Sequence, residues 1–191
     1  MKLRKAVVIP LILAMTLGLS SCRATERYMR AQEALEESRP LICEKEFGRY
    51  RFDPGWVEVE SESVDPDLYT YCLEEDLDSA VRPYYVTVRC EANDYGPDNY
   101  RQFSDDHYQM LTEEYGAENI EYDGFIITDN ESGITQIDFE IYDSDVHIYE
   151  WHLFIEDYHV TFELTVNDEE LAIQNSVVDE AFNAACSISI D

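Results

Sequence analysis

Histidines and carboxylates in the last third of the chain have the residue types of a metal site. His152 and His159 flank a predicted turn, and Glu150 and Glu163 lie on the same two predicted strands. Imidazole and carboxylate groups are ligands that zinc accepts. A shared site would require one particular register between the strands, and the sequence contains no H-x-H pair. We therefore predict no metal ligands and no cofactor.

Two oxygen-rich loops offer a different cation chemistry. Asp143-Ser144-Asp145 and residues 93–99 are rich in carboxylates and amides. Calcium binds six to eight oxygen ligands, but neither loop has the spacing of an EF-hand, with its central glycine and terminal glutamate. A divalent-cation (calcium) binding surface protein is therefore the alternative function rather than the first.

Catalytic motifs do not support an enzyme. The chain contains neither G-x-S-x-G nor H-E-x-x-H. Carboxylates are abundant, but nothing in the sequence singles out two of them as a glycosidase-like pair. We predict no catalytic residues, and a hydrolase with an unrecognised carboxylate pair is the third hypothesis.

The N-terminus has the features of an export signal. Met1 to Lys5 is cationic, residues 6–19 are almost wholly apolar, and Ser20-Ser21 precede a cysteine. The apolar run is shorter than the roughly 20 residues that a spanning helix needs. Leu19-Ser20-Ser21-Cys22 resembles the lipobox of bacterial lipoproteins, which implies a lipid on the Cys22 thiol and cleavage before Cys22.

This N-terminus divides the chain into three parts. We expect a signal peptide at residues 1–21, a charged helical tether at residues 22–40 and one domain at residues 41–191. Two acyl chains on one cysteine would anchor the mature protein stably, because a single short chain holds only marginally. The predicted location is the extracytoplasmic side of the cell membrane.

The other cysteines fit an exported protein. An even number of cysteines outside the cytoplasm suggests two disulfides, and four cysteines allow three pairings. The candidates are Cys43, Cys72, Cys90 and Cys186. We favour Cys72–Cys90 and Cys43–Cys186, although the strand alternation places Cys72 and Cys90 on different faces, so a bulge would be needed. In an oxygen-free habitat all four would remain thiols.

The charge excludes one class of partner. The formal charge is −29, and cleavage before Cys22 would remove Lys2, Arg4 and Lys5 but no acidic residue, giving −32. Nucleic-acid binding needs Lys and Arg against phosphate, so we predict no nucleic acid. Anionic headgroups would also repel the protein, so the lipid on Cys22 must hold it at the membrane. The acidity fits a solvated surface, a cation site or a basic protein partner.

The elements predicted by periodicity alternate between strands and two helices. The first helix carries a stripe of Tyr100, Phe103, His107, Met110 and Leu111, with Asp98 as N-cap and Gly116 ending it in the αL conformation. We expect His107 and His147 to be partly buried and hydrogen-bonded. Strands are predicted at residues 49–52, 56–59, 67–74, 84–90, 120–128, 134–142, 146–155 and 158–166.

The last strands predict a meander with one apolar and one acidic face. A closing helix follows Asn167 or Asp168. Its predicted packing stripe is Val177, Val178, Ala181, Phe182, Ala185 and Cys186.

Seven tyrosines exceed what one core needs, and tyrosine is enriched at protein interfaces. They are Tyr69, Tyr71, Tyr84, Tyr85, Tyr95, Tyr100 and Tyr122. They indicate either a binding surface or residues that span the core and its rim, and we favour the second.

The order of elements resembles the PsbP-like family over residues 41–191. The resemblance rests on the stretch Tyr50 to Trp56, on the strand pair Ile148 to Phe162, and on the closing helix running into Ser187-Ile188. It implies an α+β fold, a mainly antiparallel sheet flanked by helices in an αβα sandwich. It also implies a non-enzymatic binding or assembly module. The leading hypothesis is a lipid-anchored, non-catalytic domain that binds an envelope protein partner.

Overall fold

The computed structural model describes most of the second of two compact units, Met1–Arg39 and Pro40–Asp191. The described residues are 38–60, 62, 67–96, 99–122, 127–128, 133–143, 146–167 and 171–190. The predicted signal peptide, Cys22 and nearly all of the tether lie outside them. None of the described helices is both long enough and apolar enough to cross a bilayer.

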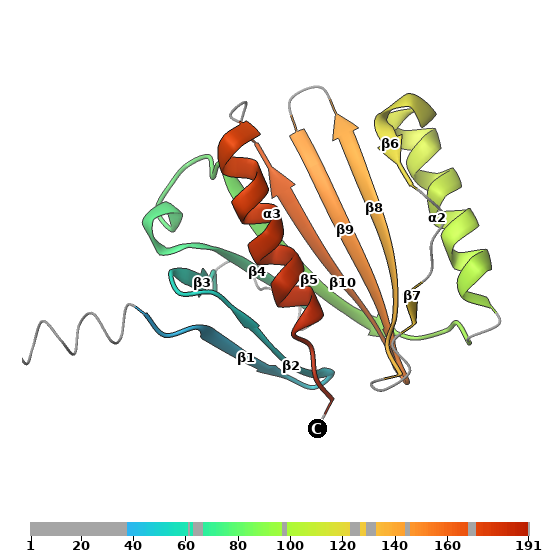
Figure 1. The fold of residues 1–191 in the computed structure, drawn as a ribbon, viewed down its shortest axis with the longest axis horizontal. Coiled ribbons are helices and arrows are strands. Elements are labelled where there is room, and N and C mark those ends of the chain that lie inside the picture. Colours follow the sequence, from blue (N-terminus) through green and yellow to red (C-terminus); the bar gives the residue numbers. More distant parts are fainter. Residues whose placement is uncertain are drawn as a thin grey trace, which may run out of the picture. The chain divides into compact units, whose positions relative to one another are not determined.

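An eight-stranded antiparallel sheet forms the centre of this unit (Figure 1). Its order is β3-β4-β5-β10-β9-β8-β6, with β7 also paired to β8. The strands are β3 (Trp56–Glu58), β4 (Leu68–Leu73), β5 (Tyr84–Ala92), β6 (Ile120–Glu121), β7 (Ile127–Thr128), β8 (Thr135–Asp143), β9 (Val146–Ile155) and β10 (Tyr158–Val166). A separate hairpin joins β1 (Leu41–Lys45) to β2 (Gly48–Phe52).

Two helices of 16 residues, α2 (Tyr100–Tyr115) and α3 (Leu171–Cys186), flank the sheet. Short 3-10 turns, η1 (Glu74–Asp76) and η3 (Ala117–Asn119), complete the elements. The helix α3 packs on β2, β10 and β9, whereas α2 packs on β8 and β6. Figure 1 shows α3 crossing the sheet and α2 lying beside β8. The predicted α+β architecture is confirmed.

The two faces of the sheet have different cores. The α3 face includes Val86, Trp151 and Phe162 and is covered by α3 and the β1–β2 hairpin, which contributes Tyr50 and Phe52. The α2 face has a smaller apolar cluster, which is Tyr100, Phe103, Leu111, Ile137, Phe139, Ile141 and Phe154.

The predicted single apolar face of the meander is wrong. In the ladder between β8 and β9, Ile137 pairs with His152 and Phe139 with Glu150. Directly paired residues lie on the same face of a sheet. The apolar side of β8 therefore belongs to the α2 face, while the apolar side of β9, with Trp151, belongs to the α3 face.

The helices differ from the predicted stripes at a few positions. Met110 is 49% exposed, while Tyr100, Phe103 and Leu111 are buried. Asp98 lies outside the described residues. Gly116 ends α2 with φ of +91° but ψ of 140°, so it needs glycine without being αL.

The closing helix places small residues against the sheet. Val177, Ala181, Ala184 and Ala185 are buried, whereas Phe182 and Cys186, which belonged to the predicted stripe, are exposed. Alanine lets the helix axis approach the large aromatic side chains of the α3 face closely.

The end of the chain is tied back to the hairpin. Arg49 and Ser189 exchange two backbone hydrogen bonds of 2.8 Å. Gly48 has φ of +138°, and a Cβ there would lie 2.7 Å from the Ser189 carbonyl oxygen. Any other residue would therefore disturb this junction.

The two predicted disulfides are absent from the structure, in which Cys43, Cys72, Cys90 and Cys186 are all free thiols. Tyr71 pairs with Val86, so the register places Cys72 roughly 17 Å along the ladder from Cys90, beyond the Cα separation of about 4.4–6.8 Å that a disulfide allows. The Cys72–Cys90 prediction is wrong for this fold.

The two cysteines of the other predicted disulfide, Cys43 and Cys186, lie in different environments. Cys43 is buried beside Tyr71 inside the α3-face core, whereas Cys186 is exposed near Asp138 at the end of α3.

Candidate functional site

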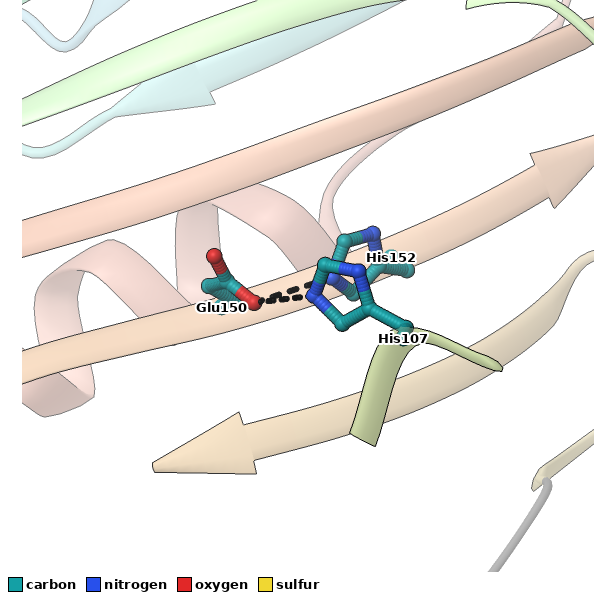
Figure 2. Close-up of side chains that lie close together, drawn as sticks. All are labelled: His107, Glu150 and His152. Carbon is teal, nitrogen blue, oxygen red and sulfur yellow. Dashed lines mark hydrogen bonds and ion pairs between the residues drawn. The ribbon is translucent and has the colours of Figure 1, made fainter. Parts of the chain in front are cut away.

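His107, Glu150 and His152 form a buried cluster between α2 and the sheet (Figure 2). Nε2 of His107 lies 2.7 Å from Oε2 of Glu150, and Nε2 of His152 lies 3.2 Å from the same oxygen. The side chains of His107 and Glu150 are 13% and 11% exposed, and His152 is buried. One carboxylate oxygen thus accepts hydrogen bonds from two imidazoles that come from different elements.

Strand alternation brings two of these residues to the α2 face. On β9, Trp151 points into the α3-face core, so its neighbours Glu150 and His152 must point the other way. On α2, His107 follows Phe103 by four residues and therefore lies on the same side of the helix. The two rings stack with centroids 5.3 Å apart, which holds His107 against the sheet.

A second layer of polar groups surrounds His152. Its Nδ1 lies 3.1 Å from Nε2 of His159 and 3.2 Å from Oγ1 of Thr161, both on β10. The ring of His159 stacks on Phe154 at 4.5 Å. Both ring nitrogens of His152 therefore have hydrogen-bond partners, so its orientation is well determined.

The cluster favours a charged carboxylate. Burial alone would raise the pKa of Glu150, but the hydrogen bonds from His107 and His152 lower it to about 2. Burial lowers the pKa of His152 against the opposing effect of Glu150. Burial, with the imidazoles of His152 and His107 nearby, lowers the pKa of His159 to about 3. A negative charge is thus concentrated on Glu150.

A second carboxylate lies directly across from Glu150. In the ladder between β9 and β10, Glu163 pairs with Glu150, so both are on the α2 face. Burial, followed by the negative charge of Glu150, raises the pKa of Glu163. Like charges directly opposite each other on neighbouring strands are destabilising.

This arrangement has two chemical capacities. The ligand atoms of His107, Glu150 and His152 all lie within 4.8 Å of one another, and two imidazoles with one carboxylate are a known zinc-binding set. Without a metal, the same groups form a charged hydrogen-bond network that ties α2 to β9.

The sequence had identified part of this cluster. It grouped His152, His159, Glu150 and Glu163, and the structure places all four on one face. It missed the role of His107, whose expected partial burial and hydrogen bonding are confirmed. The signal available was the position of His107 one turn after Phe103, but nothing in the sequence matched α2 to β9.

The two candidate calcium loops are described only in part. Ser144, Asp145, Pro97 and Asp98 lie outside the described residues. Asn93 uses its side chain to hold the chain, since its Oδ1 accepts from the Tyr95 amide at 3.0 Å and its Nδ2 donates to the Glu156 carbonyl at 2.9 Å. This amide is therefore engaged in turn structure.

The seven tyrosines are divided between the core and its rim, which is the interpretation that the sequence favoured. Tyr71, Tyr84 and Tyr100 are buried, and the other four, Tyr69, Tyr85, Tyr95 and Tyr122, are half-buried.

An open acidic groove lies on the α3 face, between α3 and the edge of the sheet. The register places Glu140 across from both Glu121 and Tyr149, and Asp138 across from Trp151. Its lining includes four carboxylates and four aromatic residues, which are Glu121, Asp138, Glu140, Asp179, Phe139, Tyr149, Trp151 and Phe182.

The groove combines carboxylates with aromatic side chains, of which Phe182 is exposed, Tyr149 half-buried and Trp151 buried. Burial, followed by the charge of Glu140, raises the pKa of Tyr149 to about 12. The rings of Trp151 and Phe182 lie 6.0 Å apart, and Phe182 is 38% exposed. Aromatic rings beside carboxylates are suited to cationic groups.

Comparison with known proteins identifies the fold. No protein-family model matches the chain, and no curated protein matches its sequence. The solution structure of cyanobacterial PsbP (CyanoP) from Synechocystis sp. PCC 6803 is similar, with a TM-score of 0.54 and 12% identity over 81% of this chain and 94% of that one.

The Ran-binding protein Mog1p of Saccharomyces cerevisiae is also similar, with a TM-score of 0.50 and 16% identity. The match covers 80% of this chain and 96% of Mog1p. At these identities the similarity establishes the architecture alone. The domain therefore has a PsbP-like fold.

Proposed function

We propose that this protein is a lipid-anchored, non-catalytic protein of the cell envelope that binds a basic segment of a partner protein. The observation that carries the proposal is the groove on the α3 face, where four carboxylates lie beside Trp151 and Phe182. Lysine and arginine side chains complement both parts, because they pair with carboxylates and pack over aromatic rings.

The fold supports a binding role. Mog1p is named as a Ran-binding protein, so a domain of this architecture binds a protein in at least one case. The net charge of −29 adds long-range attraction for a basic partner, which speeds association at low salt.

The N-terminus supports the location. Leu19-Ser20-Ser21-Cys22 follows a cationic start and an apolar run, which is the pattern of a lipidated export signal. A Cys22→Ser variant should lose the lipid and move from the membrane fraction to the soluble fraction. Continued membrane association of that variant would contradict lipid anchoring.

Calorimetric titration with a defined peptide tests the binding role. The probe is a synthetic peptide rich in lysine, with a glutamate-substituted peptide as its negative control. The full chain in detergent should bind the lysine peptide, and the groove variant Asp138→Asn with Glu140→Gln should bind it about tenfold more weakly, a difference of about 1.4 kcal/mol.

A charge-matched control variant distinguishes binding in the groove from attraction by the net charge of the protein. Glu74→Gln with Glu75→Gln removes the same number of charges from η1, where both residues are exposed. It should bind the peptide almost as well as the unaltered chain. Equal weakening by both double variants would mean that the peptide responds to total charge, and the groove proposal would be abandoned.

A further inference from the structure

We infer that His107, Glu150 and His152 form a binding site for a zinc ion. This goes beyond the proposed binding function, because the cluster lies on the α2 face and the groove lies on the α3 face.

The donor atoms already stand near the spacing that zinc requires. Tetrahedral zinc with bonds of about 2.0–2.2 Å holds its ligand atoms roughly 3.3 Å apart. The distances from Oε2 of Glu150 to Nε2 of His107 and of His152 are 2.7 Å and 3.2 Å, and all three ligand atoms lie within 4.8 Å of one another. Small side-chain shifts would therefore convert the hydrogen-bonded triangle into three metal ligands.

The groups behind His152 are those that orient a metal-binding imidazole. A histidine that binds through Nε2 carries its proton on Nδ1 and donates it to a neighbouring acceptor. Nδ1 of His152 has His159 Nε2 at 3.1 Å and Thr161 Oγ1 at 3.2 Å. Both can accept that proton and keep the Nε2 lone pair directed at the metal.

An independent feature favours a cation at this place. Glu163 pairs directly with Glu150, which sets two carboxylates side by side on the half-covered face. Two groups oppose this repulsion: the Thr165 hydroxyl, 3.4 Å from Oε1 of Glu163, and the exposed guanidinium of Arg89, which also lies 3.9 Å from Glu91. A divalent ion at the cluster would offset the repulsion between the two glutamates.

The open part of the α2 face lies at β5, where Thr87 is half-exposed and Arg89 is exposed. The helix α2 covers the cluster and reaches β10, because the ring of Phe103 lies 5.1 Å from that of His152 and 5.0 Å from that of His159. The strand β9, which carries Glu150 and His152, is two strands away from β5 in the sheet.

The ligand types select zinc over calcium. Calcium and magnesium prefer oxygen ligands, and imidazole suits zinc and its transition-metal neighbours. Three protein ligands leave a fourth position for water. Bound zinc would link α2 to β9 and hold the helix on the sheet.

Zinc titration of the full chain, purified in detergent and stripped with a chelator, tests the site. Calorimetry near neutral pH should show one saturable equivalent of zinc, with no comparable heat from calcium. His107→Gln should weaken binding by more than roughly tenfold. The control His147→Gln removes a half-buried histidine from the opposite face of β9 and should leave binding unchanged.

Cobalt absorption distinguishes lost ligation from lost structure. Co²⁺ should give tetrahedral d–d bands in the unaltered chain and in His147→Gln, but not in His107→Gln, while metal-free circular dichroism stays alike in all three. Thiolate-to-cobalt charge-transfer bands would instead place the metal on cysteine. That result, absence of saturable zinc binding, or equal binding by His107→Gln would overturn the site.

A result that overturns the zinc site would not affect the proposal of peptide binding in the groove. The lysine peptide should bind His107→Gln as well as it binds the unaltered chain, because the groove lies on the other face of the sheet. The two proposals therefore fail separately.

Discussion

The two faces of one sheet bury polar groups in opposite ways. On the α3 face, the hydroxyls of Tyr50 and Tyr71 meet at 2.7 Å inside an aromatic core, and each is 1% exposed or less. On the α2 face, Glu150 is charged and shared by two histidines at the border of the covered region. The two tyrosines are neutral and satisfy each other's hydrogen bond, whereas the cluster of Glu150 with His107 and His152 carries a negative charge.

The covering elements account for this difference. The α3 face is closed by alanines of α3 together with the hairpin residues Tyr50 and Phe52, which leave no room for a solvated ion. The α2 face is closed by one helix, which packs on β8 and β6 and reaches β9 and β10 through Phe103 and His107. A neutral hydrogen-bonded pair suits a dry core, while an ionised group needs either partners or access to water.

The largest expected effect is truncation of the α3-face core. Phe162 is fully buried and its ring lies 5.1 Å from that of Tyr50. Phe162→Ala should cost about 5 kcal/mol of unfolding free energy, and Phe103→Ala on the α2 face about 3 kcal/mol, because Phe103 lies at a more open edge. Urea unfolding measures both. A larger loss for Phe103→Ala would make the α2 face the dominant core.

The two paired glutamates should respond unequally. Glu150→Gln removes the charge that two buried histidines share, and we expect a loss of about 2–3 kcal/mol with a chelator present. Glu163→Gln removes the repelling neighbour, so it should change stability by less than about 0.5 kcal/mol or raise it slightly. Equal losses in urea unfolding would mean that the histidines do not distinguish the two carboxylates.

The smallest effect concerns alkaline stability. Burial raises the pKa of both Tyr50 and Tyr71 above the ordinary value, so their neutral forms stabilise the fold below about pH 10 and this contribution is lost as the pH rises further. Near neutral pH, the unfolding free energy of the double variant Tyr50→Phe with Tyr71→Phe should differ from that of the unaltered chain by less than about 1 kcal/mol, because both hydrogen-bond partners are removed together.

The urea midpoint of this double variant should also fall less steeply above about pH 10. If the urea midpoint falls equally with pH in the unaltered chain and in the double variant, groups other than these two tyrosines control alkaline unfolding.

Much of the fold was predictable because its elements are marked locally. Alternation identified most of the strands, and the spacing of Tyr100, Phe103 and Leu111 identified α2. The disulfides were not predictable, since the distance between Cys72 and Cys90 depends on the register of β4 against β5.

The candidate site was half predictable for the same reason. The alternation of side chains along β9 determines that Glu150 and His152 lie on the same face of the sheet. Alternation cannot tell whether that face is in solvent or covered by a helix, and the structure places the acidic side of β9 under α2.

The sequence by itself determined which side chains alternate along each strand, where the helices lie, and the excess of negative charge. Only the tertiary structure decided that β8 and β9 turn their apolar sides to opposite faces and that His107 meets a glutamate 43 residues away. The physical reason is that alternation and helical spacing are local properties of the backbone, whereas contact between distant elements depends on strand register and on which helix covers which face.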